Sequence, residues 1–375
     1  AVILIDEYDK PLTDTIGQPE LQEKIRSILQ GLYGIMKKAD RYIRFAFLTG
    51  VTRYGKLGIF SAANNPQDIS MNDDFASICG ITEEELRRYF DAEVEVFAKK
   101  QHVDKDAMYE MLKQKYDGYH FSSNSEDIYN PFSLLNSLKT RSLSNYWFAT
   151  GTPTYLVTIL KKKSYDLSKF SRGVTVMVES MTSFGNGDGS VIAALYQSGY
   201  LTIKSYDGKK YYRLGFPNEE VEDGFVQCLM EEYTVTTSGE IDEDLQHLGS
   251  LISMGDINGF MTQIQQIMSQ IPFESNDAKL IEANFRNMLY LMIRSTGHKV
   301  LVEYPVLGGR IDVFFQTEQF AYVIECKRDQ SAAEALAQID EKKYADKLSV
   351  QNKKIVKIGV NFSTEERNLT EWKEG

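Results

Sequence analysis

Cysteine and histidine are scarce in this chain, and their scarcity excludes several kinds of site. The 375 residues include 3 Cys and 4 His. The cysteines, Cys79, Cys228 and Cys326, lie far apart without paired spacing, which excludes a disulfide framework and a zinc ribbon and favours a reducing cytoplasm. The histidines also occur singly, so we do not expect a histidine-based metal site.

Long apolar segments are absent as well. No run reaches the roughly 20 residues that span a bilayer, and no basic and apolar signal segment opens the chain. The chain is 42% hydrophobic with 26 Gly and 8 Pro, which is typical of a folded globular protein. Its length favours two or three domains. We therefore expect a cytoplasmic protein without a membrane partner.

The chain has fewer positive than negative residues, and the difference is concentrated in one part of the sequence. The net charge is -11. Residues 1–278 contain 27 Lys+Arg and 39 Asp+Glu, whereas residues 279–375 contain 15 and 14. The carboxyl-terminal part is therefore close to neutral. A neutral surface without a basic stripe argues against tight, non-specific binding of nucleic acid by this part alone.

Three polar residues near the carboxyl terminus form the most informative pattern. Asp312 lies in one strand-like run, and Glu325 and Lys327 lie two residues apart in the next, so both should face one side of a sheet. If the two strands pair, Asp312 joins them. Two carboxylates can hold a divalent metal, and an adjacent ammonium can activate water or stabilise a phosphate. Ordinary β alternation with a snorkelling lysine is the structural alternative.

The flanking segments supply a recognisable order of elements. We expect a helix over 278–296, a strand at about 299–305, the Asp312 and Glu325 strands, a helix that begins with the capping box Ser331–Glu334, and a strand over 354–360. This order resembles the PD-(D/E)xK nuclease superfamily, with its restriction-endonuclease-like α-βββ-α-β domain.

The resemblance implies roles for particular residues. Asp312, Glu325 and Lys327 match the catalytic Asp, Glu and Lys, and Glu282 matches an acid that many members add to the metal site. Gln338 and Tyr344 match a Gln and a Tyr of related nucleases only loosely. The implied cofactor is Mg²⁺ or Mn²⁺, and the implied partner is nucleic acid, with DNA favoured. Cys326 alternates away from the site, so we expect a small buried side chain rather than a reactive thiol.

The amino-terminal segment predicts a second ligand site. Residues 1–5 form an apolar strand that ends in Asp6 and Glu7, the pattern of a Walker B element, where Asp holds magnesium and Glu orients water. A helical pattern follows, and then an apolar strand over 42–48 that ends at Thr49. This β-α-β order would place a sensor-like polar residue beside the two acids.

Several longer motifs carry a specific resemblance. They occur together in the AAA-ATPase-like family, whose members commonly add a carboxyl-terminal PD-(D/E)xK domain. The motifs are Asp6-Glu7-Tyr8-Asp9-Lys10-Pro11, Phe47-Leu48-Thr49-Gly50-Val51, Phe60-Ser61 with Asn64-Asn65, Tyr116-Asp117-Gly118-Tyr119, Tyr129-Asn130-Pro131, and Trp147 with Thr150-Gly151-Thr152-Pro153. The resemblance implies that Asp6, Glu7 and Thr49 bind Mg·ATP, that Arg53 is either a phosphate contact or an inert loop residue, and that the protein forms a homo-oligomer.

A phosphate loop should precede the Walker B strand, and no residues precede it here. We therefore expect a fragment that lacks the P-loop of a P-loop-type ATPase domain and binds ATP poorly by itself. Residues 50–57 match G-x-x-x-x-G-K but end in Leu57 instead of Ser or Thr, which removes the hydroxyl that binds magnesium.

The expected architecture is α/β with three parts. Residues 1–217 form the partial AAA-like domain, in which Asp207-Gly208 predicts a hairpin within 200–214 as part of a winged-helix-like lid. Residues 218–277 form a helical connector, and residues 278–375 form the nuclease-like domain. Two functions stay open: a metal-dependent nuclease under nucleotide control, and a nucleotide-dependent switch whose nuclease-like domain only binds a partner.

Overall fold

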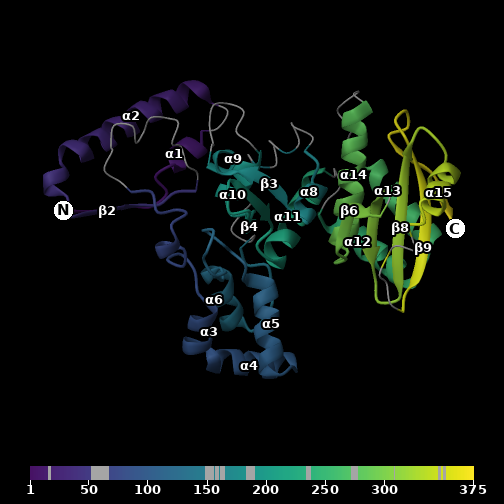
Figure 1. Cartoon of the computed structure of the whole chain (residues 1–375), viewed down its shortest axis with the longest axis horizontal. Helices are drawn as coiled ribbons and strands as arrows, with labels where there is room; N and C mark the ends of the chain where they lie inside the picture. Colours follow the sequence, from purple (N-terminus) through teal and green to yellow (C-terminus); the bar gives the residue numbers. More distant parts are fainter. Residues whose placement is uncertain are drawn as a thin grey trace. The chain divides into compact units, whose positions relative to one another are not determined.

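The protein is described by a computed structural model of the whole chain (Figure 1). It describes residues 1–15, 18–51, 67–147, 156, 160, 165–182, 191–233, 238–271, 278–307, 309–344, 348 and 352–375. The chain forms two compact units. The first comprises residues 1–159 and 173–222, and the second comprises residues 160–172 and 223–375.

The first unit combines short strands with helices. Its described elements are β1 (Val2–Ile5), α1 (Lys10–Thr13), α2 (Pro19–Lys38), η1 (Asp40–Tyr42), β2 (Phe45–Leu48), η3 (Asp73–Phe75), α3 (Glu83–Tyr89), α4 (Asp91–Gln101), α5 (Lys105–Tyr116), α6 (Pro131–Thr140), β3 (Val174–Met177), α9 (Val178–Thr182), α10 (Val191–Gln197), β4 (Thr202–Tyr206) and β5 (Tyr211–Gly215).

The strands β1 and β2 pair in parallel, from Val2↔Phe45 to Ile5↔Leu48. The helix α2 connects them, as the sequence pattern predicts for a β-α-β unit. Their carboxyl ends therefore lie side by side, which is where α/β sheets bind ligands.

The hairpin expected around Asp207-Gly208 is present as β4 and β5, and β3 pairs with the other side of β5. Asp207 accepts hydrogen bonds from the backbone N–H groups of Lys209, Lys210 and Tyr211, and Gly208 has a left-handed φ of 75°. The side chain and the glycine together favour the turn. The winged-helix assignment of this region stays a prediction.

The second unit is a sheet covered by helices. Its described elements are α8 (Ser168–Arg172), most of α11 (Glu219–Tyr233), α12 (Ser238–Met254), α13 (Ile257–Ser269), α14 (Ala278–Ser295), β6 (Val300–Val306), β7 (Gly309–Gln316), β8 (Phe320–Arg328), α15 (Ala332–Glu341), β9 (Lys354–Ser363) and β10 (Asn368–Glu374). The order from α14 to β9 follows the expected α-βββ-α-β pattern, and β10 extends it.

The five strands lie in the order β10-β9-β8-β7-β6. Only β8 and β9 pair in parallel, and the intervening α15 is their crossover. One face packs on α15 through Phe314, Val323 and Ile339. Phe315 and Tyr322 of the opposite face lie against Phe260 of α13. Two covered faces explain why β8 is apolar at nearly every position before Glu325.

The helix α15 lies very close to β9. A Cβ atom at Gly359 would be 2.2 Å from the carbonyl oxygen of Ala332 and 2.5 Å from the backbone nitrogen of Leu336. Glycine is therefore needed at this position for helix and strand backbones to meet. The helix begins with the capping box expected at Ser331 and Glu334, which satisfies its first N–H groups.

Candidate functional site

The adjacent strands β7 and β8 bring the two carboxylates together. Their antiparallel pairing runs from Gln316↔Ala321 to Val313↔Ile324. Asp312 and Glu325 are the next position of this register. The pairing stops there, and a carboxylate oxygen of Asp312 (Oδ2) instead accepts a hydrogen bond of 2.8 Å from the backbone N–H of Cys326. The side chain of Asp312 thus holds β8 at the point where the strands separate.

The alternation of β6 and β7 is interrupted at the same level. Pairing passes from Val302↔Val313 to Tyr304↔Ile311 and omits the position at which Glu303 and Asp312 face each other. Glu303 has a left-handed φ of 47°, which is uncommon for a residue with a side chain. Such irregularities often re-aim side chains beside active sites.

Glu325 and Lys327 share one side of β8, as the alternation predicts, and α15 covers them. The side-chain amide of Gln338 on α15 donates a hydrogen bond to Glu325 Oε1, and its carbonyl oxygen accepts one from Lys327 Nζ. Lys327 Nζ lies 3.9 Å from Glu325 Oε1. Gln338 therefore connects the lysine to the carboxylate.

Gln338 and Tyr344, the two loosely matched residues, lie in different surroundings. Gln338 belongs to the site, although its spacing in the sequence is a weak signal. Tyr344 is buried in the core between α15 and the sheet, and a Cβ atom at Gly309 would be 2.7 Å from its hydroxyl oxygen. Tyr344 therefore packs under the turn that begins β7 and does not contact the polar cluster through a described hydrogen bond.

Burial changes the electrostatics of both carboxylates. The pKa of Glu325 is raised, first by burial and second by the negative charge of Asp312, while Lys327 opposes the shift. Burial also raises the pKa of Asp312, while the Cys326 N–H and Lys327 oppose that shift. Burial thus disfavours ionisation of both carboxylates, and the charge of Asp312 disfavours that of Glu325 further, until a cation compensates the negative charge.

The arrangement fits a divalent cation. Glu325 is only 3% exposed, and its Oε2 atom is buried without a hydrogen-bond partner among the described residues. An unpartnered buried carboxylate oxygen is costly unless a ligand binds it. Asp312 and Glu325 supply two hard oxygen donors, and Mg²⁺ is commonly held by one or two carboxylates together with water and substrate phosphates.

The third expected ligand, Glu282, lies on α14, and its side chain is outside the described residues. Within the described part of the chain, no group of three or more His, Cys, Asp and Glu side chains is arranged to hold a metal. A cation here would therefore rest on Asp312 and Glu325 among those residues.

We predicted a small buried side chain without thiol reactivity at Cys326, and its lack of reactivity stays a prediction. Part of the residue remains accessible, but burial of its thiol raises its pKa well above the usual value. A raised pKa disfavours the thiolate, which is the nucleophilic form.

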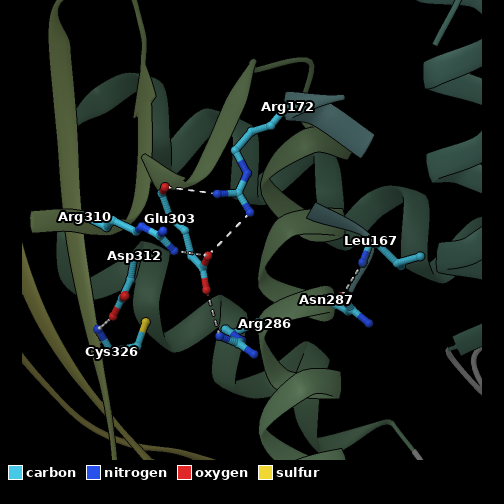
Figure 2. A network of polar contacts seen from close by, with 8 residues as sticks. All are labelled: Leu167, Arg172, Arg286, Asn287, Glu303, Arg310, Asp312 and Cys326. Atoms are coloured by element: carbon cyan, nitrogen blue, oxygen red, sulfur yellow. Dashed lines mark hydrogen bonds and ion pairs between the residues drawn. The ribbon is translucent and has the colours of Figure 1, made fainter. Parts of the chain in front are cut away.

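A cluster of arginines lies beside the carboxylates, and the sequence patterns did not indicate it. Arg172, Arg286 and Arg310 all contact the carboxylate of Glu303 at 3.3–3.5 Å. Figure 2 shows the three guanidinium groups directed at Glu303, with Asp312 near Arg310.

The amino-terminal candidates also lie together. The hydroxyl group of Thr49 donates a hydrogen bond to Asp6 Oδ1 and accepts one of 3.2 Å from the N–H of Glu7. Glu7 has a left-handed φ of 53°, and its side chain is solvent-exposed near Lys10. Asp6 and Thr49 therefore occupy the carboxyl ends of β1 and β2, which is where α/β sheets bind ligands.

Two candidates lie outside the described residues: Arg53 and nearly all of the segment 50–57 that resembles a phosphate loop. Among the helices of the described residues, none is both long and apolar enough to cross a membrane.

Comparisons with known proteins agree with the two parts of the chain. The family described as "PD-(D/E)XK nuclease superfamily" matches residues 280–372, and the family described as "Predicted AAA-ATPase" matches residues 1–60. A relative from Azotobacter chroococcum mcd 1, "Uncharacterized protein in vnfD 5'region", is 32% identical over 376 residues, which cover 98% of this chain and 70% of the relative. No solved structure matches the chain. The chain therefore belongs to the family of AAA-ATPase-like proteins that carry a carboxyl-terminal domain of the PD-(D/E)XK nuclease superfamily.

Proposed function

We propose that the carboxyl-terminal unit is a metal-dependent nuclease that cleaves phosphodiester bonds. The observation that carries this proposal is the buried, unpartnered Oε2 atom of Glu325 beside a second, partly buried carboxylate, Asp312. Burial and the charge of Asp312 raise the pKa of Glu325, so a divalent cation between the two carboxylates would stabilise the site.

Each residue has a distinct role in this proposal. Asp312 and Glu325 hold Mg²⁺ or Mn²⁺, with Glu282 as a further ligand. The metal supplies Lewis acidity toward the phosphate and lowers the pKa of a bound water. Lys327 donates hydrogen bonds to the attacking water or to the pentavalent phosphate. Gln338 keeps the Lys327 ammonium and the Glu325 carboxylate in their relative positions.

The amino-terminal strand ends support a nucleotide site. Asp6 would bind the magnesium of ATP, Glu7 would orient water, and Thr49 would contact the phosphate side. We infer that ATP binding or hydrolysis in the intact protein controls the nuclease. The three thiols, Cys79, Cys228 and Cys326, suit a cytoplasmic location.

Nucleic acid is the proposed substrate, and we favour DNA. The near-neutral charge of residues 279–375 implies that affinity comes from local contacts or from assembly rather than from a broad basic surface. A homo-oligomer would multiply such contacts.

The test is cleavage by the purified chain. Single- and double-stranded DNA and RNA are incubated with Mg²⁺ or Mn²⁺, and Lys327→Ala is compared with wild type. We expect cleavage by wild type only, with Lys373→Ala on strand β10 as the matched lysine control. Equal cleavage by wild type and Lys327→Ala would overturn the proposal.

The near-neutral charge also supports a second candidate, a nuclease-like module that binds a partner without cleaving it. This candidate needs no metal site. Calorimetric Mg²⁺ binding that disappears in Asp312→Asn would argue against it.

A further inference from the structure

Three arginines share one carboxylate next to the candidate metal site. We propose that Arg172, Arg286 and Arg310 bind a phosphate group of the nucleic-acid substrate, and that Glu303 holds their guanidinium groups in place until this phosphate arrives. The inference rests on the proposed nuclease function, since it names a second substrate contact for the same site.

The position of the cluster suits a phosphate that neighbours the scissile one. Glu303 on β6 faces Asp312 on β7 at the position where the pairing of the strands is interrupted. Arg286 also influences Asp312 electrostatically, because its positive charge acts to lower the pKa of that carboxyl group. A substrate strand held by Asp312 and Glu325 through a cation would therefore pass beside these guanidinium groups (Figure 2).

Three guanidinium groups gather on one carboxylate. Arg172, Arg286 and Arg310 all contact the carboxylate of Glu303. Each guanidinium group has five N–H donors, and two N–H groups of one guanidinium can bind two oxygen atoms of a phosphate. A phosphodiester presents oxygen atoms that these N–H donors can bind.

The contacts to Glu303 are long for charged pairs. Arg286 Nη1 lies 3.4 Å from Oε1, and Arg310 Nη1 lies 3.3 Å from Oε2, whereas optimised charge-assisted hydrogen bonds measure about 2.7–2.9 Å. Arg310 is 68% exposed, so a ligand can reach it from solvent. The left-handed backbone of Glu303 also supports a ligand site, because such outliers are frequent at ligand clamps.

The third arginine is held in place by a buried amide. Asn287 on α14 is 1% exposed, accepts a hydrogen bond of 2.9 Å from the N–H of Leu167, and donates one of 2.8 Å to the carbonyl oxygen of Tyr165. These bonds fix the residues that lead into α8. Arg172, at the end of α8, then donates a hydrogen bond of 3.2 Å to the carbonyl oxygen of Glu303 (Figure 2).

A purely structural ion cluster makes different predictions from a phosphate site. In a structural cluster, Glu303 is the essential partner, and its loss should be as harmful as the loss of an arginine. In a phosphate site, Glu303 competes with the ligand, so its removal should not weaken binding of nucleic acid.

The experiment measures binding separately from cleavage. Fluorescence anisotropy of a labelled oligonucleotide, single-stranded or duplex, is recorded with Asp312→Asn as the parent chain and with EDTA present. Arg286→Gln, Arg310→Gln and Glu303→Gln are compared with Lys373→Gln, which removes one positive charge from β10 at the opposite edge of the sheet. Thermal melts verify folding, and Arg286→Lys is used if Arg286→Gln does not fold.

We expect Arg286→Gln and Arg310→Gln each to weaken binding by about tenfold, as for the loss of a charged hydrogen bond. Each should lower the slope of log affinity against log salt by about one. The affinity of Lys373→Gln should remain within about twofold of that of the parent, well below the tenfold change expected for a lost contact. Glu303→Gln should bind the oligonucleotide as tightly as the parent or more tightly. Arginine variants that bind like Lys373→Gln would overturn the inference, as would a folded Glu303→Gln that binds about tenfold more weakly.

Failure of this inference can be told apart from failure of the proposed function. If wild type does not cleave but binding depends on the arginines, the phosphate site stands and the nuclease assignment falls. If wild type cleaves, Arg310→Gln should raise KM and leave kcat nearly unchanged. Cleavage with KM unaffected by Arg310→Gln overturns the phosphate site alone.

Discussion

The two candidate sites of this protein differ in exposure and in how much structure surrounds them within their own unit. Asp6, Glu7 and Thr49 lie at the exposed ends of a two-stranded sheet and are joined mainly by the hydroxyl group of Thr49. Asp312 and Glu325 lie within a five-stranded sheet, with Glu325 buried under α15.

This difference indicates what each site needs in order to act. The exposed acids, Asp6 and Glu7, carry little desolvation penalty. They need no bound cation until a ligand arrives with its own phosphates and magnesium. The Glu325 carboxylate is costly to ionise without a cation, because burial and the charge of Asp312 raise its pKa. The carboxyl-terminal site is therefore the better organised of the two for chemistry within this chain.

Replacing Glu325 by Gln should have the largest effect. The change removes one of two metal-binding carboxylates, so we expect metal-dependent cleavage to fall on the order of 10³-fold, about 4 kcal/mol of transition-state stabilisation. A single-turnover cleavage assay measures it. Glu318→Gln, in the exposed turn between β7 and β8, is the matched control. Undiminished cleavage by Glu325→Gln would contradict the conclusion that the carboxyl-terminal site is the better organised for chemistry.

Replacing Gln338 by Ala should have the next largest effect. It removes the amide that connects Glu325 to Lys327, and the loss of such supporting residues typically costs about 10- to 100-fold in metal affinity or activity. The measurement is the cleavage rate at saturating metal, with the exposed Gln319→Ala as the control. A rate equal to wild type would mean that the site does not depend on α15.

Replacing Gly359 by Ala tests the packing that supports the buried site. The new methyl group would meet the backbone of α15 at Ala332 and Leu336, so we expect a loss of about 1–3 kcal/mol in the free energy of unfolding. Gly34→Ala in α2 is the contrasting control, because nothing lies within 4 Å of its added methyl group. That change should stabilise α2 by up to about 1 kcal/mol. Denaturant unfolding measures both, and equal effects would contradict the close packing of α15.

The stabilisation by metal should depend on pH. Burial raises the pKa values of Asp312 and Glu325 in the folded, metal-free protein. Their contribution to stability is therefore present at pH values below the ordinary carboxylate pKa and is lost as the pH rises through the raised values. A cation binds the ionised carboxylates. The gain in the free energy of unfolding on adding Mg²⁺ should therefore grow over this range, by up to about 1.4 kcal/mol per pH unit for each proton released. Thermal melts with and without Mg²⁺ measure this gain, at pH values from about 4, near the ordinary carboxylate pKa, to the raised pKa of Glu325 of about 8. A gain that does not change with pH would show that metal binding releases no protons.

The sequence predicted the framework of the carboxyl-terminal site because its signals are local. Strand alternation placed Glu325 and Lys327 on one face, and the capping box at Ser331 located the start of α15. The apolar run before Asp6 and the run before Thr49 likewise predicted two strand ends. The strand β10 was not predicted.

The remaining features depend on contacts between distant segments. Arg172 lies 131 residues before Glu303 in the sequence, and no periodic pattern connects them. The left-handed conformation of Glu303 has no local signal such as a glycine. Gln338 had only a loose spacing match, and its importance became clear from its two hydrogen bonds.

Calorimetric titration with Mn²⁺ tests the central claim, that Asp312 and Glu325 share one divalent cation. We expect a saturable isotherm for wild type, its loss in Asp312→Asn, and its retention in Glu318→Gln. An isotherm in Asp312→Asn that equals that of wild type would contradict the account.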